Sequence, residues 1–180
     1  MTWLFFLLSR HPEVARKVEH EVARELDGQA PVAEDLDRLV YLEQVIQETL
    51  RVYPPAFMLP REVVSEDRIG GYTIPAKAWV VLSPYVTHRR ADFWENPEGF
   101  DPERFTPEAS AGRHPAAYFP FFLGPHKCIG QGMAMMEMKT VVATVLQRCR
   151  LDLHAGFEPR PDAQISLRTK DGMLMRPRWR

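Results

Sequence analysis

A chain of 180 residues has the length of about one domain, and its hydrophobic fraction of 45% is ordinary for a globular protein. Its 23 basic and 24 acidic residues give a net charge of -1, so the charge does not indicate binding to nucleic acid or to an acidic membrane surface. The apolar run at positions 3–8 is too short to span a bilayer and lacks the basic leader of a secretory signal. We therefore expect no membrane or export segment in this chain.

The first elements of the chain are expected to be helices. Pro12 stands at a favoured first-turn position, and valine and leucine recur every three to four residues up to Leu26, where an Asp-Gly pair ends the pattern. A second helix is expected over residues 41–53, with one apolar stripe. Pro54 and Pro55 end it, because proline lacks the amide donor and disfavours a helical conformation in the residue before it.

The middle and the end of the chain predict small sheets, a long loop and a third helix. "RIGGYTIP" is a Gly-Gly hairpin signal, and "AWVVLSPYV" is a β-branched run typical of a strand. Residues 88–105 lack periodicity and read as a compact loop packed by its own side chains. A helix follows over 129–147, and the tail 163–180 predicts a hairpin that turns at Asp171-Gly172. The chain is thus expected to be a single domain, residues 1–180, that is mainly α with small β-sheets, an α+β fold.

The two cysteines, Cys128 and Cys149, fit neither a disulfide framework nor a paired metal motif. A helix over 129–147 would separate them by roughly 30 Å, given its rise of about 1.5 Å per residue. A disulfide requires Cα atoms within about 7 Å. We therefore expect Cys149 to be a half-buried residue at a helix end and Cys128 to be a reduced thiol of an intracellular protein.

Cys128 lies in the segment "FFLGPHKCIG", directly before the third helix. The unpaired amides and the positive end of the helix dipole should stabilise its thiolate, which is the form that binds a metal or attacks an electrophile. A lone cysteine is more often a small buried hydrophobe, so its neighbours decide. Gly124 and Gly130 remove side-chain bulk on both sides, which suits a flat ligand. Phe121 can shield the sulfur from water, and His126 can donate to an anionic group of the same ligand. A ligand role is favoured over a nucleophile, because no base stands beside the thiol.

The spacing Phe121-x-x-Gly124-x-His126-x-Cys128-x-Gly130 resembles the heme-binding signature of the cytochrome P-450 family. In that family the cysteine is the axial ligand of the iron of heme b. The resemblance therefore implies a heme-thiolate site at this loop. It also implies that Arg61 pairs with a heme propionate and that His126 stands where the family commonly has arginine or histidine.

Two segments upstream are similar to further motifs of the family, in the family's order. "ETLR" at residues 48–51 matches the ExxR motif, and "PERF" at residues 102–105 matches the motif of the loop before the cysteine. Alone, ExxR indicates only a solvated ion pair. In this context Glu48 and Arg51 share one helix face, and Arg104 can complete a charged triad. Such a network fixes geometry more than it adds stability, because desolvation offsets much of its attraction.

The resemblance implies a monooxygenase that uses O2 to hydroxylate a small apolar organic substrate. Electrons would come from a separate partner of the ferredoxin or flavin reductase type, since the chain has no dinucleotide fingerprint. Lys127, Lys139 and Arg113 are candidates for docking this partner. Met58 and Leu59 are candidates for lining the substrate pocket. For His88 and Arg89 only a surface or packing role is expected.

The resemblance covers the whole chain but corresponds to less than half of a family member. The part present is the carboxy-terminal one, truncated before the distal oxygen-activation motif. We therefore expect Phe5, Phe6 and Leu7 to lose their cover and the chain alone to be a poor catalyst. A bacterial cytosolic location is expected, with a membrane anchor in a missing amino-terminal half as the alternative.

Two other functions stay open at this point. The chain can be a non-catalytic fragment that binds heme weakly or binds only a protein partner. It can also carry out peroxygenase or isomerase chemistry at the same heme-thiolate site without a reductase. A zinc or redox-cysteine protein is disfavoured, because no second thiol or histidine cluster completes such a site.

Overall fold

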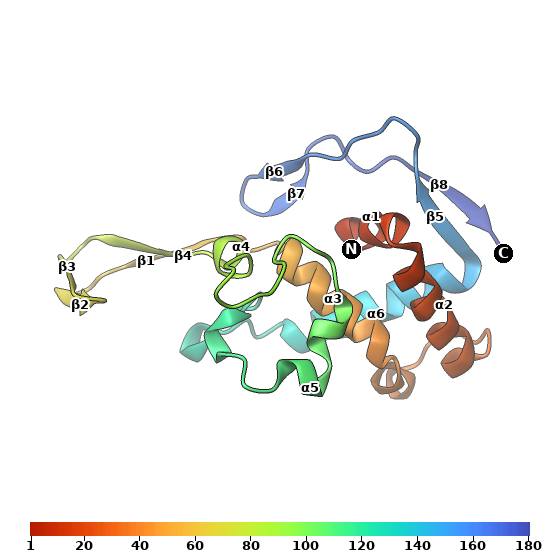
Figure 1. Cartoon of the computed structure of the whole chain (residues 1–180), viewed down its shortest axis with the longest axis horizontal. Helices are drawn as coiled ribbons and strands as arrows, with labels where there is room; N and C mark the ends of the chain where they lie inside the picture. The colour runs from red at the N-terminus through yellow and green to blue at the C-terminus, as the bar shows by residue number, and fades with distance from the viewer.

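The structure is a computed structural model that describes residues 1–180. It consists of packed helices and four separate two-stranded antiparallel sheets (Figure 1). The helices are α1 (Thr2–Arg10), α2 (Pro12–Leu26), η1 (Ala33–Arg38), α3 (Val40–Val52), α4 (Pro84–Thr87), η2 (Pro102–Phe105), α5 (Pro107–Ser110), η3 (Pro115–Ala117), η4 (Gly124–His126) and α6 (Gln131–Arg148). The strands are β1 (Leu59–Glu62), β2 (Asp67–Ile69), β3 (Tyr72–Ile74), β4 (Trp79–Leu82), β5 (Cys149–Leu153), β6 (Pro161–Ala163), β7 (Leu167–Thr169) and β8 (Met175–Trp179).

The hydrophobic core lies among α1, α2, η1, α3 and α6. Val18, Leu42, Ile46 and Val142 are fully buried members of this cluster. Valine, leucine and isoleucine recur every three to four residues in α2 and α3, so each helix turns one apolar face toward the cluster. The prediction of these two helices is confirmed, with α3 starting one residue before the predicted position.

A carboxylate from α2 fixes the first turn of α3. The helix has no side-chain cap of its own. Glu21 is buried, and its two carboxylate oxygens accept hydrogen bonds from the amides of Tyr41 at 2.7 Å and Leu42 at 2.8 Å. The first amides of a helix have no partner inside it and lie at the positive end of its dipole. The negative charge of Glu21 therefore holds α3 in a defined position against α2.

The predicted Gly-Gly hairpin is confirmed as β2 and β3. Gly70 and Gly71 have φ angles of 58° and 86°, which a two-residue hairpin turn needs and which glycine adopts without strain. β1 pairs with β4, and this sheet continues into the hairpin. The whole arm projects away from the helices, on the left in Figure 1.

The tail pairs differently from the prediction. Asp171-Gly172 does turn the chain, but the segments on its two sides have different partners: β7 pairs with β6, while β8 pairs with β5. In the second of these sheets Cys149 lies opposite Trp179. The predicted hairpin across Asp171-Gly172 is therefore wrong, because the local signal marks a turn and does not select the strand that the next segment joins.

The observed ends of α6 and the burial of α1 differ from the predictions. α6 begins at Gln131, two residues later than predicted, and Cys149 is a buried residue that opens β5. The prediction that α1 loses its cover is wrong for Leu7, which is buried, while Phe5 and Phe6 are half-buried. The reason is that α1 contacts α2, α3 and β5 of the same chain. None of the helices has both the length and the apolar composition required to cross a bilayer.

Candidate functional site

The cysteine loop, residues 121–130, brings Cys128 to the start of α6. The amide of Cys128 donates to the carbonyl of Phe121 at 2.9 Å, and the amide of Lys127 donates to the carbonyl of Gly124 at 3.1 Å. Gly124 has a φ of 73°, in the left-handed region that favours glycine. These bonds fold the loop back on itself and leave the Cys128 side chain exposed.

Four backbone amides beside the thiol donate no hydrogen bond within the chain. They belong to Ile129, Gly130, Gly132 and Met133. Unpaired amides at a helix start carry partial positive charge toward an anion placed there. These unpaired amides leave the start of α6, next to Cys128, free to donate to an anionic group.

The thiol faces open space bordered by apolar side chains. Cys128 lines a hollow of about 600 Å³ together with Pro125, Lys127, Ile129, Gln131, Gly132 and Met135. The side chain of Ile129 is fully exposed, and that of Met133 is largely exposed. A Cβ added at Gly130 would lie 3.8 Å from the Cys128 sulfur, and one added at Gly124 would meet nothing within 4 Å. A flat ligand can thus approach the sulfur without displacing a side chain of the loop.

The other residues predicted to contact heme are placed in different environments. Phe121 is half-buried and packs against the hydrophobic core. His126 is exposed, and its imidazole makes no hydrogen bond within the chain. Arg61 lies in β1, where its guanidinium donates only to the carbonyl of Pro60, at 3.3 Å. No hydrogen bond joins Arg61 to the cysteine loop, so the structure does not bring these residues into direct contact.

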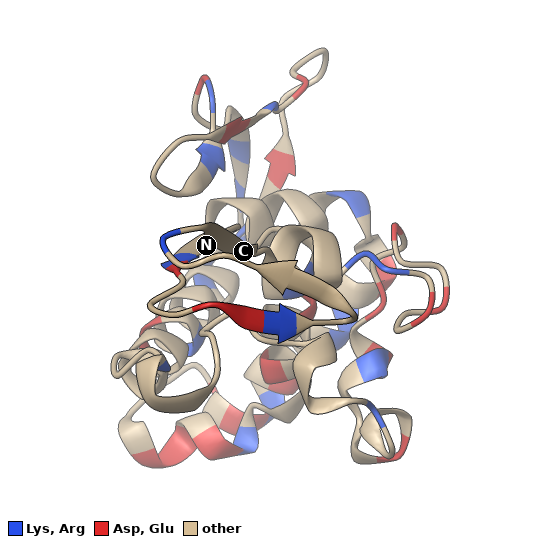
Figure 2. Cartoon of the chain, turned by 90° about the vertical axis from the view of Figure 1, so that its left-hand side faces the viewer, with Lys and Arg blue, Asp and Glu red and all other residues tan.

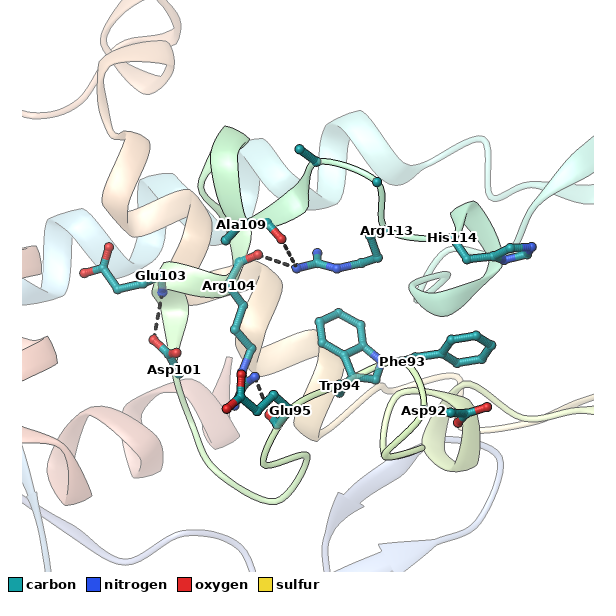
Figure 3. Close-up of a pocket in the computed structure, with 12 residues that line it drawn as sticks. Asp92, Phe93, Trp94, Glu95, Asp101, Glu103, Arg104, Ala109, Arg113 and His114 are labelled. Carbon is teal, nitrogen blue, oxygen red and sulfur yellow. Dashed lines mark hydrogen bonds between the residues drawn. The ribbon is translucent and has the colours of Figure 1, made fainter.

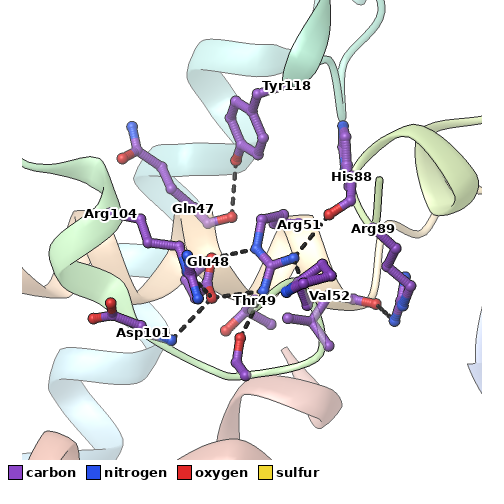
Figure 4. A network of polar contacts seen from close by, with 12 residues as sticks. Gln47, Glu48, Thr49, Arg51, Val52, His88, Arg89, Asp101, Arg104 and Tyr118 are labelled. Carbon is purple, nitrogen blue, oxygen red and sulfur yellow. Dashed lines mark hydrogen bonds and ion pairs between the residues drawn. The ribbon is translucent and has the colours of Figure 1, made fainter. Parts of the chain in front are cut away.

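Glu48, Arg51 and Arg104 meet beneath the loop that precedes the cysteine (Figure 4). The side chains of Glu48 and Arg51 have no exposed surface. Nε and Nη2 of Arg51 donate to the two carboxylate oxygens of Glu48 at 2.6 and 2.9 Å, and Nε of Arg104 lies 3.5 Å from Glu48 Oε1. Burial raises the pKa of Glu48 above its ordinary value, while the hydrogen bond and the charge of Arg51 oppose this shift.

The remaining donors of Arg51 bind loop carbonyls. Nη1 donates to the carbonyls of His88 at 2.8 Å and Pro97 at 2.7 Å, and Nη2 donates to the carbonyl of Gly99 at 2.7 Å. The carboxylate of Glu48 also accepts from the amide of Asp101 at 2.9 Å. One ion pair on α3 therefore binds four backbone groups between His88 and Asp101.

His88 and Arg89 have specific partners in the structure that the sequence does not indicate. His88 is fully buried rather than on the surface, and its Nε2 accepts a hydrogen bond from the amide of Phe119 at 2.9 Å. Arg89 donates to the carbonyl of Val52 at the end of α3, and its guanidinium lies 3.8 Å from the centroid of the Tyr85 ring. The bonds to Phe119 and Val52 join segments that are distant in sequence, so no local motif predicts them.

A second hollow, of about 640 Å³, lies over the loop before the cysteine (Figure 3). The guanidinium of Arg113 lies 4.4 Å from the centroid of the Trp94 ring and donates to the carbonyls of Arg104 and Ala109. Arg104 donates in turn to the carbonyl of Asn96 at 3.0 Å. The arginines of this hollow are therefore occupied in holding the loop backbone.

The predicted docking residues for an electron donor do not form one surface. Lys127 is exposed beside the thiol. Lys139 is buried, with its ammonium bonded to Glu43 at 2.5 Å and to the carbonyl of Leu36 at 2.9 Å, and Arg113 is half-buried. The prediction is thus wrong for Lys139 and Arg113, because charge along a sequence does not reveal which side chains pair inside the fold. In Figure 2 basic and acidic residues are interspersed over the elements.

Comparison with known proteins decides the family. The family model described as "Cytochrome P-450" matches residues 1–176. The chain belongs to the cytochrome P-450 family. Members of this family are heme-thiolate monooxygenases, so the chain belongs to a family of oxidoreductases, and its helices and small antiparallel sheets are part of the cytochrome P-450 fold, as predicted.

Three relatives indicate how much of a cytochrome P-450 is present. The chain is 40% identical to human cytochrome P-450 4V2 over 180 residues, which are 98% of this chain and 34% of that protein. It is 38% identical to the probable cytochrome P-450 4aa1 of Drosophila melanogaster, over 98% of this chain and 35% of that protein. It is 39% identical to cyclooctat-9-en-7-ol 5-monooxygenase of Streptomyces melanosporofaciens, over 84% of this chain and 33% of that protein. The chain spans about a third of the length of these relatives.

The expectation of a bacterial cytosolic protein is wrong. Relatives that match 98% of the chain at 38–40% identity are animal proteins, from human, orangutan and fruit fly. The expectation rested on the lack of an apolar span in 180 residues. A chain that covers a third of its relatives cannot decide location from that feature.

Proposed function

We propose that residues 1–180 form the carboxy-terminal, heme-binding portion of a cytochrome P-450 monooxygenase and that Cys128 is the axial ligand of heme b. The observation that supports this most directly is the exposed thiol at the start of α6, with unpaired amides around it and a hollow beside it. The family membership supports a heme-thiolate cofactor in general. The assignment to Cys128 rests on the geometry of the loop.

The residues around Cys128 suit a flat porphyrin. The amides of Ile129 and Gly130 are free to donate hydrogen bonds, and Gly124 and Gly130 present no side chain to an approaching ring. A heme bound here would supply the activation and cleavage of O2, which a thiolate ligand favours. The chain contributes the sulfur, holds it by the backbone bond to Phe121, and keeps water from its core side.

Arg61 and His126 are proposed to bind the propionates of the heme. Both side chains are free to do so, because Arg61 donates only to a neighbouring carbonyl and His126 makes no hydrogen bond. Arginine keeps its charge at every relevant pH, whereas the charge of histidine varies near neutrality. Both side chains can therefore donate hydrogen bonds to a carboxylate group of the heme.

Glu48, Arg51 and Arg104 are proposed to position the loop that leads to Cys128. Their hydrogen bonds hold backbone groups of Pro97, Gly99 and Asp101, which belong to a stretch without regular structure. A buried ion pair adds little net stability, because the cost of desolvation offsets its attraction. Its geometric effect on the loop is therefore its main contribution.

A small apolar organic substrate and a separate electron donor of the ferredoxin or flavin reductase type complete the proposal. One relative is named as a monooxygenase of cyclooctat-9-en-7-ol, which supports an organic substrate for this chain. Met58 and Leu59, at the start of β1, are candidates for contacts with that substrate. Lys127 is the exposed basic residue beside the thiol and is a candidate for contact with the electron donor.

The ligand assignment is tested by the carbon monoxide difference spectrum of the reduced, heme-reconstituted chain. We expect the band typical of a thiolate ligand in the unsubstituted chain and in the control Cys149→Ala, since Cys149 is buried in β5. Cys128→Ala should lose this band. If the unsubstituted chain and Cys128→Ala take up heme alike and neither shows the band, Cys128 is not the ligand.

A further inference from the structure

His88 connects the Glu48 and Arg51 pair with the segment that enters the cysteine loop. Its backbone carbonyl accepts from Nη1 of Arg51 at 2.8 Å, and its ring Nε2 accepts from the amide of Phe119 at 2.9 Å. Nε2 can accept only in a neutral imidazole whose proton is on Nδ1. The side chain is fully buried, so water does not compete for this acceptor. Figure 4 shows His88 beside Arg51, with the ring turned away from the ion pair.

Backbone hydrogen bonds connect Phe119 with Cys128. The amide of Phe122 donates to the carbonyl of Phe119 at 3.0 Å, in a turn where Phe122 has a φ of 59°. Phe121, inside this turn, accepts the amide of Cys128 at 2.9 Å. The residue that His88 holds is therefore the first of a turn whose third residue holds the cysteine.

Packing alone does not account for a histidine at this place. The ring does pack, with its centroid 5.2 Å from that of Tyr118 and 5.4 Å from that of Phe119. An apolar side chain of similar size could make the same contacts. It would, however, leave the amide of Phe119 without an acceptor, and a buried unpaired donor destabilises the fold.

We propose that His88 is a positioning residue for Cys128, which couples the Glu48 and Arg51 pair to the cysteine loop through its acceptor nitrogen. The proposal rests on the proposed function insofar as Cys128 is the heme ligand. The coupling itself belongs to the chain without heme and can be measured there.

Hydrogen exchange of single amides in the heme-free chain tests the coupling. His88→Leu removes the acceptor, whereas His88→Gln places a side-chain oxygen close to the position of Nε2. We expect the amides of Phe119 and Cys128 to exchange about tenfold faster in His88→Leu, since loss of one such bond corresponds to roughly that factor, and to return near the original rate in His88→Gln. The amides in the middle of α6 serve as the reference for global opening.

Spectroscopy of the heme-reconstituted chain gives a second readout, which a purely structural role would not move. The fraction of heme with the thiolate-type band should fall in His88→Leu and recover in His88→Gln. Unchanged exchange at Cys128 in His88→Leu, or equal loss in both variants, would overturn the proposal. If the unsubstituted chain shows no thiolate band, the ligand assignment fails, while the exchange data still decide the role of His88.

A third variant covers the case in which His88→Leu does not fold. The side-chain oxygen of His88→Asn lies near the position of Nδ1 and is too short to reach the amide of Phe119. The amides of Phe119 and Cys128 should therefore exchange faster in His88→Asn than in His88→Gln. Equal protection in the Asn and Gln variants would reject the acceptor role.

Discussion

Arg51 donates five hydrogen bonds from a fully buried side chain, two to Glu48 and three to the carbonyls of His88, Pro97 and Gly99. Its planar guanidinium directs some of these donors toward a carboxylate and the others toward backbone carbonyls of the loop. Lysine has one nitrogen with three donors and cannot reproduce this arrangement. At this residue the geometry of the donors therefore matters more than the charge.

Replacement of Arg51 by lysine should destabilise the chain strongly. Arg51→Lys keeps the charge but leaves buried acceptors of the loop unpaired, so we expect a loss of about 3–5 kcal/mol in the free energy of unfolding, measured with urea. Arg90→Lys is the matched control, because Arg90 pairs with Asp92 at 2.6 Å on the exposed surface. That variant should unfold like the parent chain. Similar losses in both variants would show that the buried geometry is not decisive.

His88 should make the stability depend on pH in acid. Burial lowers the pKa of His88 from 6.5 to about 4, with the charges of Arg51 and Arg89 acting in the same direction. The unfolded chain therefore binds a proton between these values that the folded chain does not bind. The contribution is complete above about pH 6.5 and is lost as the pH falls to about 4, with a total of about 3 kcal/mol.

The comparison with His88→Gln isolates this contribution, because the carboxylates titrate in both chains. The advantage of the parent chain over His88→Gln in the free energy of unfolding should shrink by about 3 kcal/mol between pH 7 and pH 4. An advantage that stays constant over this range would mean that His88 keeps the same pKa in the folded and unfolded states.

The two glycines of the cysteine loop have different backbone conformations, although they occupy equivalent places in the predicted motif. Both were expected to remove side-chain bulk beside the thiol. Gly124 has a φ of 73°, whereas Gly130 has a φ of -82°, and an added Cβ at Gly130 would meet only the sulfur of Cys128, at 3.8 Å. Gly124 is thus needed for the backbone conformation of the heme-free loop, and Gly130 is not.

Alanine at these two positions should have different effects. Gly124→Ala should cost about 1–2 kcal/mol in the free energy of unfolding of the heme-free chain, and Gly124→Asn should cost less, because asparagine tolerates the left-handed region. Gly130→Ala should leave that free energy unchanged within about 0.5 kcal/mol and weaken heme uptake, since its methyl group lies beside the sulfur. A stability loss in Gly130→Ala equal to that in Gly124→Ala would contradict this separation. Urea unfolding and heme titration of each variant provide the measurements.

Elements with a local signal were predicted from the sequence, and pairings between distant segments were not. The apolar period and the flanking prolines located α2 and α3, and two consecutive glycines located the β2 and β3 hairpin. The strand partner of β8, the burial of Lys139 and the bond between His88 and Phe119 depend on which segments meet after folding. The same distinction applies to the site: the motif around Cys128 lies within ten consecutive residues, whereas Arg89 reaches its partner Val52 only in the folded chain.

The buried hydrophobic cluster and the candidate site are held together by different sets of contacts. The cluster draws its members from residues 4–50 and 142–146, so none of them lies in the long segment between α3 and α6. Phe100 and Phe121 only pack against the cluster from that segment. The rest of the segment is fixed by the bonds of Arg51, Arg104 and His88 and by the packing of Trp94, Phe105 and Tyr118 on one another. Opening of this segment should therefore depend on contacts within the segment and with α3 more than on the buried cluster.

Hydrogen exchange across the whole chain should consequently show three levels of protection. Amides in the middle of α3 and α6 should exchange only through global unfolding, because these helices carry the buried cluster, and those of the projecting β2 and β3 hairpin should exchange fastest. The segment 95–130 should lie between them. In Arg51→Lys, the exchange of amides in this segment should accelerate by a larger factor than the exchange of amides in α6. The comparison is made at a denaturant concentration at which α6 still exchanges only through global unfolding. If the segment and α6 lose protection by the same factor, the loop opens only with the core, and the polar network has no local role.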